Sequence, residues 1–227
     1  MKICKLFAFV AVLCITFSAV FTLAGCRNKE ITSIPRVTKS AEEQERIKRE
    51  QKEAEQTSYQ TLIQIHEQCT TAAIALVNAY SFATETKTEY KTDADCLTAF
   101  CMVTGLESKT VTDAAAAVAE MWNPSDKSLR AQLRNGTTAV TIVRKALIEN
   151  GTYGTLEQLL DQSTDAMKKV SSSFSGYPSL RNYYFELVEY ATYCTSPTGS
   201  YQDIGATVKE YESSLAGMRY KLEQFME

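Results

Sequence analysis

The sequence predicts an all-α protein, in which long amphipathic helices form a bundle and several shorter helices fill one side. Past Thr57, apolar residues recur at steps of three and four along nearly the whole chain, which is the period of a helix with one buried face. No stretch alternates apolar and polar residues between turn signals, as a half-buried strand does. Glycine, proline and asparagine interrupt the pattern, and these interruptions mark the expected helix ends.

The first expected helix covers 40–57 and consists mainly of Glu, Gln, Lys and Arg. Ile47 is its one large apolar residue, and Ser40 with Glu43 forms a capping box at its start. We interpret this segment as a solvated helix about 27 Å long, which leads into a bundle domain at 58–227. The alternative, a coiled-coil or docking segment, is disfavoured because an apolar seam is missing.

The helix then continues with a core-facing half over 62–80, where Leu62, Ile65, Cys69 and Leu76 share one face. Shorter helices are expected at about 93–104, 112–122, 126–134 and 138–149. Their ends are marked by Gly105, Asn123-Pro124, Asn135-Gly136 and Asn150-Gly151. Trp122 precedes one of these breaks, and we expect it to plug the core.

Three longer helices complete the predicted bundle. An apolar stripe runs from Leu156 to Phe174, and Thr155 with Gln158 forms a capping box at its start. A second stripe runs from Leu180 to Cys194, after Pro178-Ser179. The third is the clearest and consists of Tyr201, Ile204, Val208, Tyr211, Leu215, Met218, Leu222 and Phe225.

Residues 1–25 have the composition of an export signal. Lys2 and Lys5 supply a positive head, and 6–21 are mostly Leu, Phe, Val, Ala and Ile. The run ends in Leu23-Ala24-Gly25-Cys26, which resembles the lipobox of bacterial lipoproteins. The resemblance implies cleavage before Cys26 and several acyl chains on that cysteine, enough for stable membrane anchoring. The alternatives are an uncleaved signal anchor and ordinary cleavage near Ala24.

The same resemblance implies a location in the bacterial cell envelope, with 26–39 as a flexible tether. Arg27 follows the cysteine where Asp would retain a lipoprotein in the inner membrane of enteric-like bacteria, so the outer membrane is favoured. Whether the domain faces the periplasm or the exterior stays open.

The net charge of the mature chain is negative. The full chain has 24 Lys and Arg residues and 27 Asp and Glu residues, and removal of the leader takes away two of the lysines. The mature chain is therefore mildly acidic, which argues against a nucleic-acid partner.

Four cysteines remain beyond the leader and the lipid site, namely Cys69, Cys96, Cys101 and Cys194. An even number in an exported protein indicates two disulfides. On one helix, the Cα atoms of Cys96 and Cys101 lie about 8.6 Å apart, beyond the ~7 Å that a disulfide tolerates. We therefore expect each of them to pair with Cys69 or Cys194, the alternative being four buried free thiols. The spacing lacks the paired pattern of zinc sites, and no metal or cofactor is expected.

The sequence contains no motif that names a reaction. It lacks a P-loop and a G-x-S-x-G nucleophile. The single histidine, His66, lies beside a core stripe, and we interpret it as a hydrogen-bonded structural residue. Two carboxylate pairs, Glu186 with Glu189 and Asp161 with Asp165, each share a helix face and suit general acid and base chemistry. Such pairs also arise by chance on solvated helices.

An aromatic group on the helix over 179–194 is the best candidate for a partner surface. Its aromatic residues cannot all lie on the Leu180 to Cys194 stripe, and Phe185 and Tyr193 fall on the far side. Either the helix is central and packs on both faces, or Phe185, Tyr190 and Tyr193 form an exposed contact site for a protein or a glycan.

The expected function is that of a non-enzymatic lipoprotein whose helical domain binds a protein partner. The partner would belong to envelope assembly, or to a host that meets the domain as a surface antigen. The alternative is a lipid-anchored hydrolase or carbohydrate-processing enzyme that uses the paired carboxylates.

Overall fold

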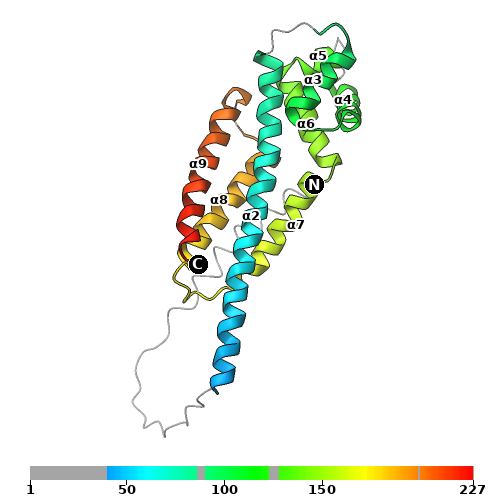
Figure 1. Ribbon diagram of the computed structural model, residues 1–227. Coiled ribbons are helices and arrows are strands. Elements are labelled where there is room, and N and C mark those ends of the chain that lie inside the picture. Colours follow the sequence, from blue (N-terminus) through cyan, green and yellow to red (C-terminus); the bar gives the residue numbers. More distant parts are fainter. Residues whose placement is uncertain (1–39, 86–89, 123–127, 199, 227) are drawn as a thin grey trace, which may run out of the picture. The chain divides into compact units, whose positions relative to one another are not determined.

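The structure is a computed structural model that describes residues 40–85, 90–122, 128–198 and 200–226. In these residues all regular secondary structure is helical, which confirms the predicted fold class (Figure 1). The expected signal segment, Cys26 and the tether at 26–39 lie outside the described residues. None of the helices in the described ranges combines the length and the apolar character needed to cross a bilayer.

The helices follow one another with short connections. Their bounds are α2 Ala41–Glu85, α3 Asp93–Thr104, α4 Ser108–Trp122, α5 Leu129–Leu133, α6 Gly136–Glu149, α7 Thr152–Met167, α8 Tyr177–Thr195 and α9 Ile204–Glu223, with a 3-10 turn η1 at Tyr201–Asp203 before α9.

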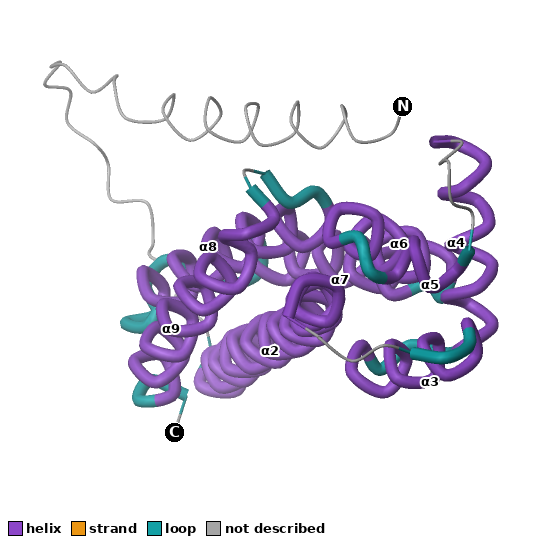
Figure 2. The backbone as a smooth tube through the Cα atoms, turned by 90° about the horizontal axis from the view of Figure 1, so that it is seen from above, coloured by secondary structure: helices purple, strands orange, loops and turns teal. Residues whose placement is uncertain are grey.

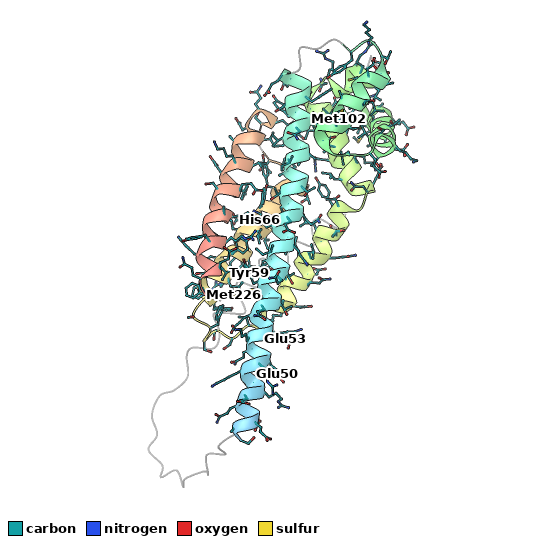
Figure 3. The ribbon with its side chains drawn as sticks, viewed as in Figure 1. Glu50, Glu53, Tyr59, His66, Met102 and Met226 are labelled. Carbon is teal, nitrogen blue, oxygen red and sulfur yellow. The ribbon has the colours of Figure 1, made fainter. Side chains whose placement is uncertain are left out.

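Helix α2 is the central element of the domain formed by 41–226. It is 45 residues long, so the solvated helix and the core-facing helix predicted from the sequence are one continuous helix. Its residues are largely exposed up to Thr57, and from Ser58 onward a buried stripe runs to Ala83. Figure 3 places Glu50 and Glu53 on the part of α2 that extends beyond the other helices.

The remaining helices pack on α2 at two levels. Helices α7, α8 and α9 lie along its middle, whereas α3 to α6 surround its C-terminal end (Figure 1). In Figure 2, α8 and α9 lie to one side of α2 and α3 lies to the other. Helix α2 packs most extensively against α6 and α7, and α8 also packs against α9. One continuous apolar core results, in which Tyr183, Tyr190 and Phe100 are the largest fully buried side chains.

Several predicted helix ends are confirmed and rest on local chemistry. Gly105 follows α3 with φ of 71°, a left-handed conformation that glycine adopts at low cost, and its N–H donates to the Cys101 carbonyl at 2.9 Å. The Asn135 side chain accepts from the Thr138 N–H at the start of α6. Gly151, with φ of 82°, separates α6 from α7.

Other boundaries differ from the prediction. Helix α4 begins at Ser108, four residues before the expected start, and α7 begins at Thr152 after Gly151. The capping box predicted at Thr155 is therefore wrong as a helix start, because the helix has already begun three residues earlier. Helix α7 also ends at Met167, so the stripe predicted to reach Phe174 is interrupted by a turn.

Two side chains from neighbouring helices bind the C-terminal carbonyls of α8. Arg144 of α6 donates to the Thr195 carbonyl at 2.8 Å, and the Tyr153 hydroxyl of α7 donates to the Cys194 carbonyl at 2.7 Å. The last carbonyls of a helix have no partner within the helix, so these bonds satisfy groups that are otherwise costly to bury. They also hold the end of α8 in a defined position against α6 and α7.

Candidate functional site

The main polar site of the core is a hydrogen-bonded cluster between α2, α8 and α9. We call it the Glu212 cluster, and it consists of Glu212, His66, Thr70, Tyr183 and Tyr190. Glu212 Oε1 accepts from the Thr70 hydroxyl at 2.6 Å and from the Tyr190 hydroxyl at 2.7 Å. Glu212 Oε2 lies 3.2 Å from His66 Nε2, and His66 Nδ1 lies 2.8 Å from the Tyr183 hydroxyl. Figure 3 labels His66 at the middle of α2.

Helical spacing explains why these residues meet. His66 and Thr70 are four apart on α2, and Tyr183 and Tyr190 are seven apart on α8, so each pair shares a helix face. Glu212 follows Val208 by four residues and precedes Leu215 by three, which places it on the buried face of α9. The sequence reasoning missed Glu212. The signal that could have identified it is its helical spacing from Val208 and Leu215, which places a charged residue on an apolar face.

The cluster keeps Glu212 ionised. Burial by itself raises the pKa of the Glu212 carboxyl, but the hydrogen bonds from Thr70, Tyr190 and His66 outweigh it and hold that pKa below its usual value. Burial raises the pKa of the Tyr183 and Tyr190 hydroxyls, so both stay protonated. The result is one carboxylate, about a third exposed at its side chain, surrounded by neutral hydroxyl donors.

A carboxylate, an imidazole and a phenol in series can orient a proton, as the Asp and His of hydrolytic triads do. Such a relay acts on a substrate only if its end group is open to solvent. Tyr183 and Tyr190 have no exposed surface, and His66 is 8% exposed. The geometry therefore supports a role in fixing α9 against α2 and α8. It agrees with the interpretation of His66 as a hydrogen-bonded residue.

One cavity on the described part of the domain lies away from the Glu212 cluster. It has a volume of about 220 Å³, and it is lined by Lys48, Gln51, Lys52, Glu55, Gln56, Phe225 and Met226. It is an open recess between α2 and the last described residues of the chain, where Figure 3 labels Met226. None of the sequence-predicted site residues lines it.

The structure does not assemble the predicted carboxylate pairs into an enclosed site. Asp161 and Asp165 are exposed on α7, and Lys168 pairs with Asp165 at 2.9 Å, which lowers the pKa of that carboxyl. A general acid needs the opposite shift. Glu189 is exposed and Glu186 is half-buried on α8.

The predicted aromatic contact site is wrong for two of its three residues. Phe185 is 44% exposed, but Tyr190 has no exposed surface and Tyr193 is 8% exposed. Tyr190 stacks on Tyr211 of α9 with ring centroids 4.9 Å apart, and Tyr193 lies 5.8 Å from the same ring. Helix α8 therefore packs on both faces, as the first of the two interpretations held, because α9 covers the face that carries Tyr190 and Tyr193.

The cysteines are also arranged differently from the prediction. Cys69, Cys96, Cys101 and Cys194 are free thiols in the structure. The expected pairing of Cys96 and Cys101 with Cys69 and Cys194 is not supported, since none of the four is bonded and the Cys194 Sγ lies 3.5 Å from the Cys69 carbonyl oxygen. Cys96 and Cys101 both belong to α3, on which Cys96 is buried and Cys101 half-buried.

Large apolar side chains are exposed at the end of the domain formed by α3 and α4. Met102 is 81% exposed and Val103 is 43% exposed on α3, while Met121 is 64% exposed and Trp122 is 47% exposed at the end of α4. Trp122 was expected in the core, and that prediction is wrong. Figure 3 shows Met102 at the opposite end of the domain from Glu50.

Within 40–85, 90–122, 128–198 and 200–226, no group of three or more His, Cys, Asp or Glu side chains is arranged to hold a metal ion. Comparison of the chain with protein-family models, with curated proteins and with solved structures finds no match. The functional argument therefore rests on the chain's own residues and their geometry.

Proposed function

We propose that this protein is a lipid-anchored lipoprotein of the bacterial cell envelope, and that its helical domain binds a protein partner without catalysing a reaction. The anchor is Cys26, on the strength of the lipobox-like segment at 23–26. The membrane is the outer membrane, because Arg27 is not an aspartate. The partner is a component of envelope assembly or a host protein at the cell surface.

The observation that carries this proposal is the exposed N-terminal part of α2, which we call the stalk and define as Ala41–Thr57. Its 17 residues extend about 25 Å at the rise of an α-helix, and nearly all of them are exposed. Its Arg46–Glu50 ion pair, at 3.7 Å, has both side chains 65% exposed, so it supports the helix from the solvent-facing side. A charged helix of this kind suits a spacer between an anchored segment and a binding domain.

The partner surface lies at the other end of α2. In the 45 residues of α2, the stalk occupies the N-terminal end and α3 to α5 surround the C-terminal end (Figure 1). The exposed Met102, Met121 and Trp122 belong to α3 and α4. Methionine adapts its shape to a partner, and tryptophan is enriched among residues that dominate binding energy. A partner that buries these side chains would bind the domain far from the stalk.

Site-specific photocrosslinking tests the partner surface. A photoreactive amino acid at Met102 or Trp122 is expected to give one discrete adduct in intact cells. The same group at Tyr220, which is 67% exposed on α9, is the matched control and is expected to give none. Loss of the Met102 adduct in a Trp122→Arg background supports a specific interface. An adduct pattern that is equal at all three positions would contradict the proposal.

The anchor has an independent test. Mass spectrometry of the protein purified from envelopes is expected to find an amino-terminal Cys26 that carries acyl chains. Cys26→Ala is expected to leave the protein in the precursor form, with its leader uncleaved and no lipid attached. A mature chain with an unmodified residue 26 would overturn the lipoprotein assignment and leave the crosslinking result to stand alone.

A further inference from the structure

The buried thiols of Cys69 and Cys194 form a pair that the sequence did not predict. Cys69 lies on α2 and Cys194 near the end of α8, 125 residues apart in the chain. Both have no exposed surface. The Cys194 Sγ–H donates to the Cys69 carbonyl at 3.5 Å, which places the Cys194 sulfur against the backbone of Cys69. The two thiols are not bonded to each other in the structure, and a bond between them requires side-chain rotation that brings the sulfurs to about 2.0 Å.

We propose that Cys69 and Cys194 are a modification site, a dithiol that closes into a disulfide between α2 and α8 when the exported chain folds. This inference rests on the proposed envelope location, because disulfides form and persist in oxidising compartments. It replaces the two bridges expected from the cysteine count by one bridge, and it leaves Cys96 and Cys101 as thiols.

The surrounding structure positions the pair. Tyr153 of α7 holds the Cys194 carbonyl at 2.7 Å, and Arg144 of α6 holds the next carbonyl, that of Thr195, at 2.8 Å. The end of α8 is therefore fixed against three helices, and the Cys194 side chain is held at one place on α2. A preformed arrangement of this kind favours one pairing over the alternatives.

The reaction balances as a thiol–disulfide exchange with a small or protein disulfide as the oxidant. The thiolate of one cysteine attacks the donor disulfide, which forms a mixed disulfide and releases one donor thiol. The second cysteine then attacks the protein sulfur of the mixed disulfide and releases the other donor thiol. Two protein thiols are oxidised, one donor disulfide is reduced, and the protein becomes lighter by two hydrogen atoms.

The timing of the reaction follows from burial. The contact with Cys69 and burial both raise the pKa of the Cys194 thiol, so little attacking thiolate forms in the folded domain. The donor also cannot reach side chains without exposed surface. Exchange therefore takes place while α8 closes onto α2, when the two cysteines already meet but the donor can still reach them, and the finished bridge is protected from reduction by the same burial.

Cys96 and Cys101 provide an internal control. They are five residues apart on one helix, a spacing that holds their Cα atoms about 8.6 Å apart and excludes a bridge between them. Cys96 has no exposed surface, so its burial matches that of Cys69 and Cys194, but the groups that act on its thiol are Arg134, Asp93 and Arg130. If the disulfide forms because Cys69 and Cys194 are close together, and not because they are buried, Cys96 is expected to stay a thiol.

Peptide mapping tests the proposal directly. Full-length protein is purified from envelopes under trapping alkylation, denatured, alkylated again and digested without reduction. We expect one linked pair of peptides that contains Cys69 and Cys194, with Cys96 and Cys101 alkylated. The same protein is also denatured, reduced, and refolded with glutathione disulfide. If all four cysteines are alkylated in both samples, the proposal is overturned.

Two further outcomes separate the bridge from the proposed location. A bridge that forms on refolding but is missing from protein taken from cells supports the pairing and counts against export. An acylated Cys26 with Cys69 and Cys194 free in both samples supports the location and overturns the bridge.

The double variant Cys69→Ala, Cys194→Ala is expected to lower the Tm of the oxidised protein by about 5–15 °C. Cys96→Ala, the matched control, is expected to lower it much less. If the double variant does not fold, the Tm of the wild-type protein is compared with and without reductant instead.

Discussion

Glu212→Ala is the substitution with the largest predicted effect on the packing of α9. Glu212 accepts from Tyr190 on α8 and from Thr70 on α2, and it pairs with His66 at 3.2 Å, so one side chain joins three helices. Truncation leaves the buried Tyr190 hydroxyl without its acceptor, which costs about 1–3 kcal/mol. Thr70 loses less, because its hydroxyl also donates to the His66 carbonyl at 2.9 Å.

Together these losses predict that Glu212→Ala lowers the free energy of unfolding by about 2–4 kcal/mol. Urea denaturation followed by far-UV circular dichroism measures this quantity. The matched control is Glu210→Ala, a change of the same kind at an exposed position of the same helix, with an expected effect within about 0.5 kcal/mol.

A double-mutant cycle with Tyr190→Phe tests the cause as well as the size. Removing the Tyr190 hydroxyl first is expected to reduce the cost of Glu212→Ala by about 1–2 kcal/mol, because the buried donor is then already absent. Equal costs in the two backgrounds, or equal effects of Glu210→Ala and Glu212→Ala, would refute the assignment of the Glu212 cluster as the contact that fixes α9.

Two further predictions concern the same domain. The pKa of Glu212 is lower in the folded state than its ordinary value of 4.5, so its ionised form stabilises the fold above that pH, and this contribution is lost as the pH falls through the folded pKa. The difference in unfolding free energy between wild type and Glu212→Gln should therefore shrink below about pH 4.5, and a difference that grows on acidification would contradict the sign. Ser58 is fully buried and its hydroxyl has no hydrogen-bond partner in the described part of the chain. Ser58→Ala is expected to be neutral or to raise the unfolding free energy by up to about 1 kcal/mol, and a loss above that size would reveal a partner for the hydroxyl.

Some features of this protein were decided by residues close together in the chain. The all-α class follows from the three- and four-residue period of the apolar side chains, which a strand cannot use. The end of α3 at Gly105 and the start of α6 after Asn135 follow from backbone and side-chain chemistry within one turn. The exposure of the stalk follows in the same way, because most of its residues are charged or polar and they form no apolar stripe. The lipid anchor at Cys26 also comes from a local segment and stays a prediction.

Other features depended on which helix faces meet, and that is decided by contacts between residues far apart in the chain. The sequence allowed Tyr190 and Tyr193 to be exposed to a partner, but in the structure Tyr211 of α9 packs on both rings. Glu212 looked like one of many solvated acids, yet it became the acceptor for α2 and α8 because its register on α9 points inward. Cys194 lies against Cys69 of α2, and not against Cys96 or Cys101 of α3, because the packing of α8 on α2 sets which residues meet. Periodicity identifies a buried face, but only the packed helices determine which residues lie opposite it.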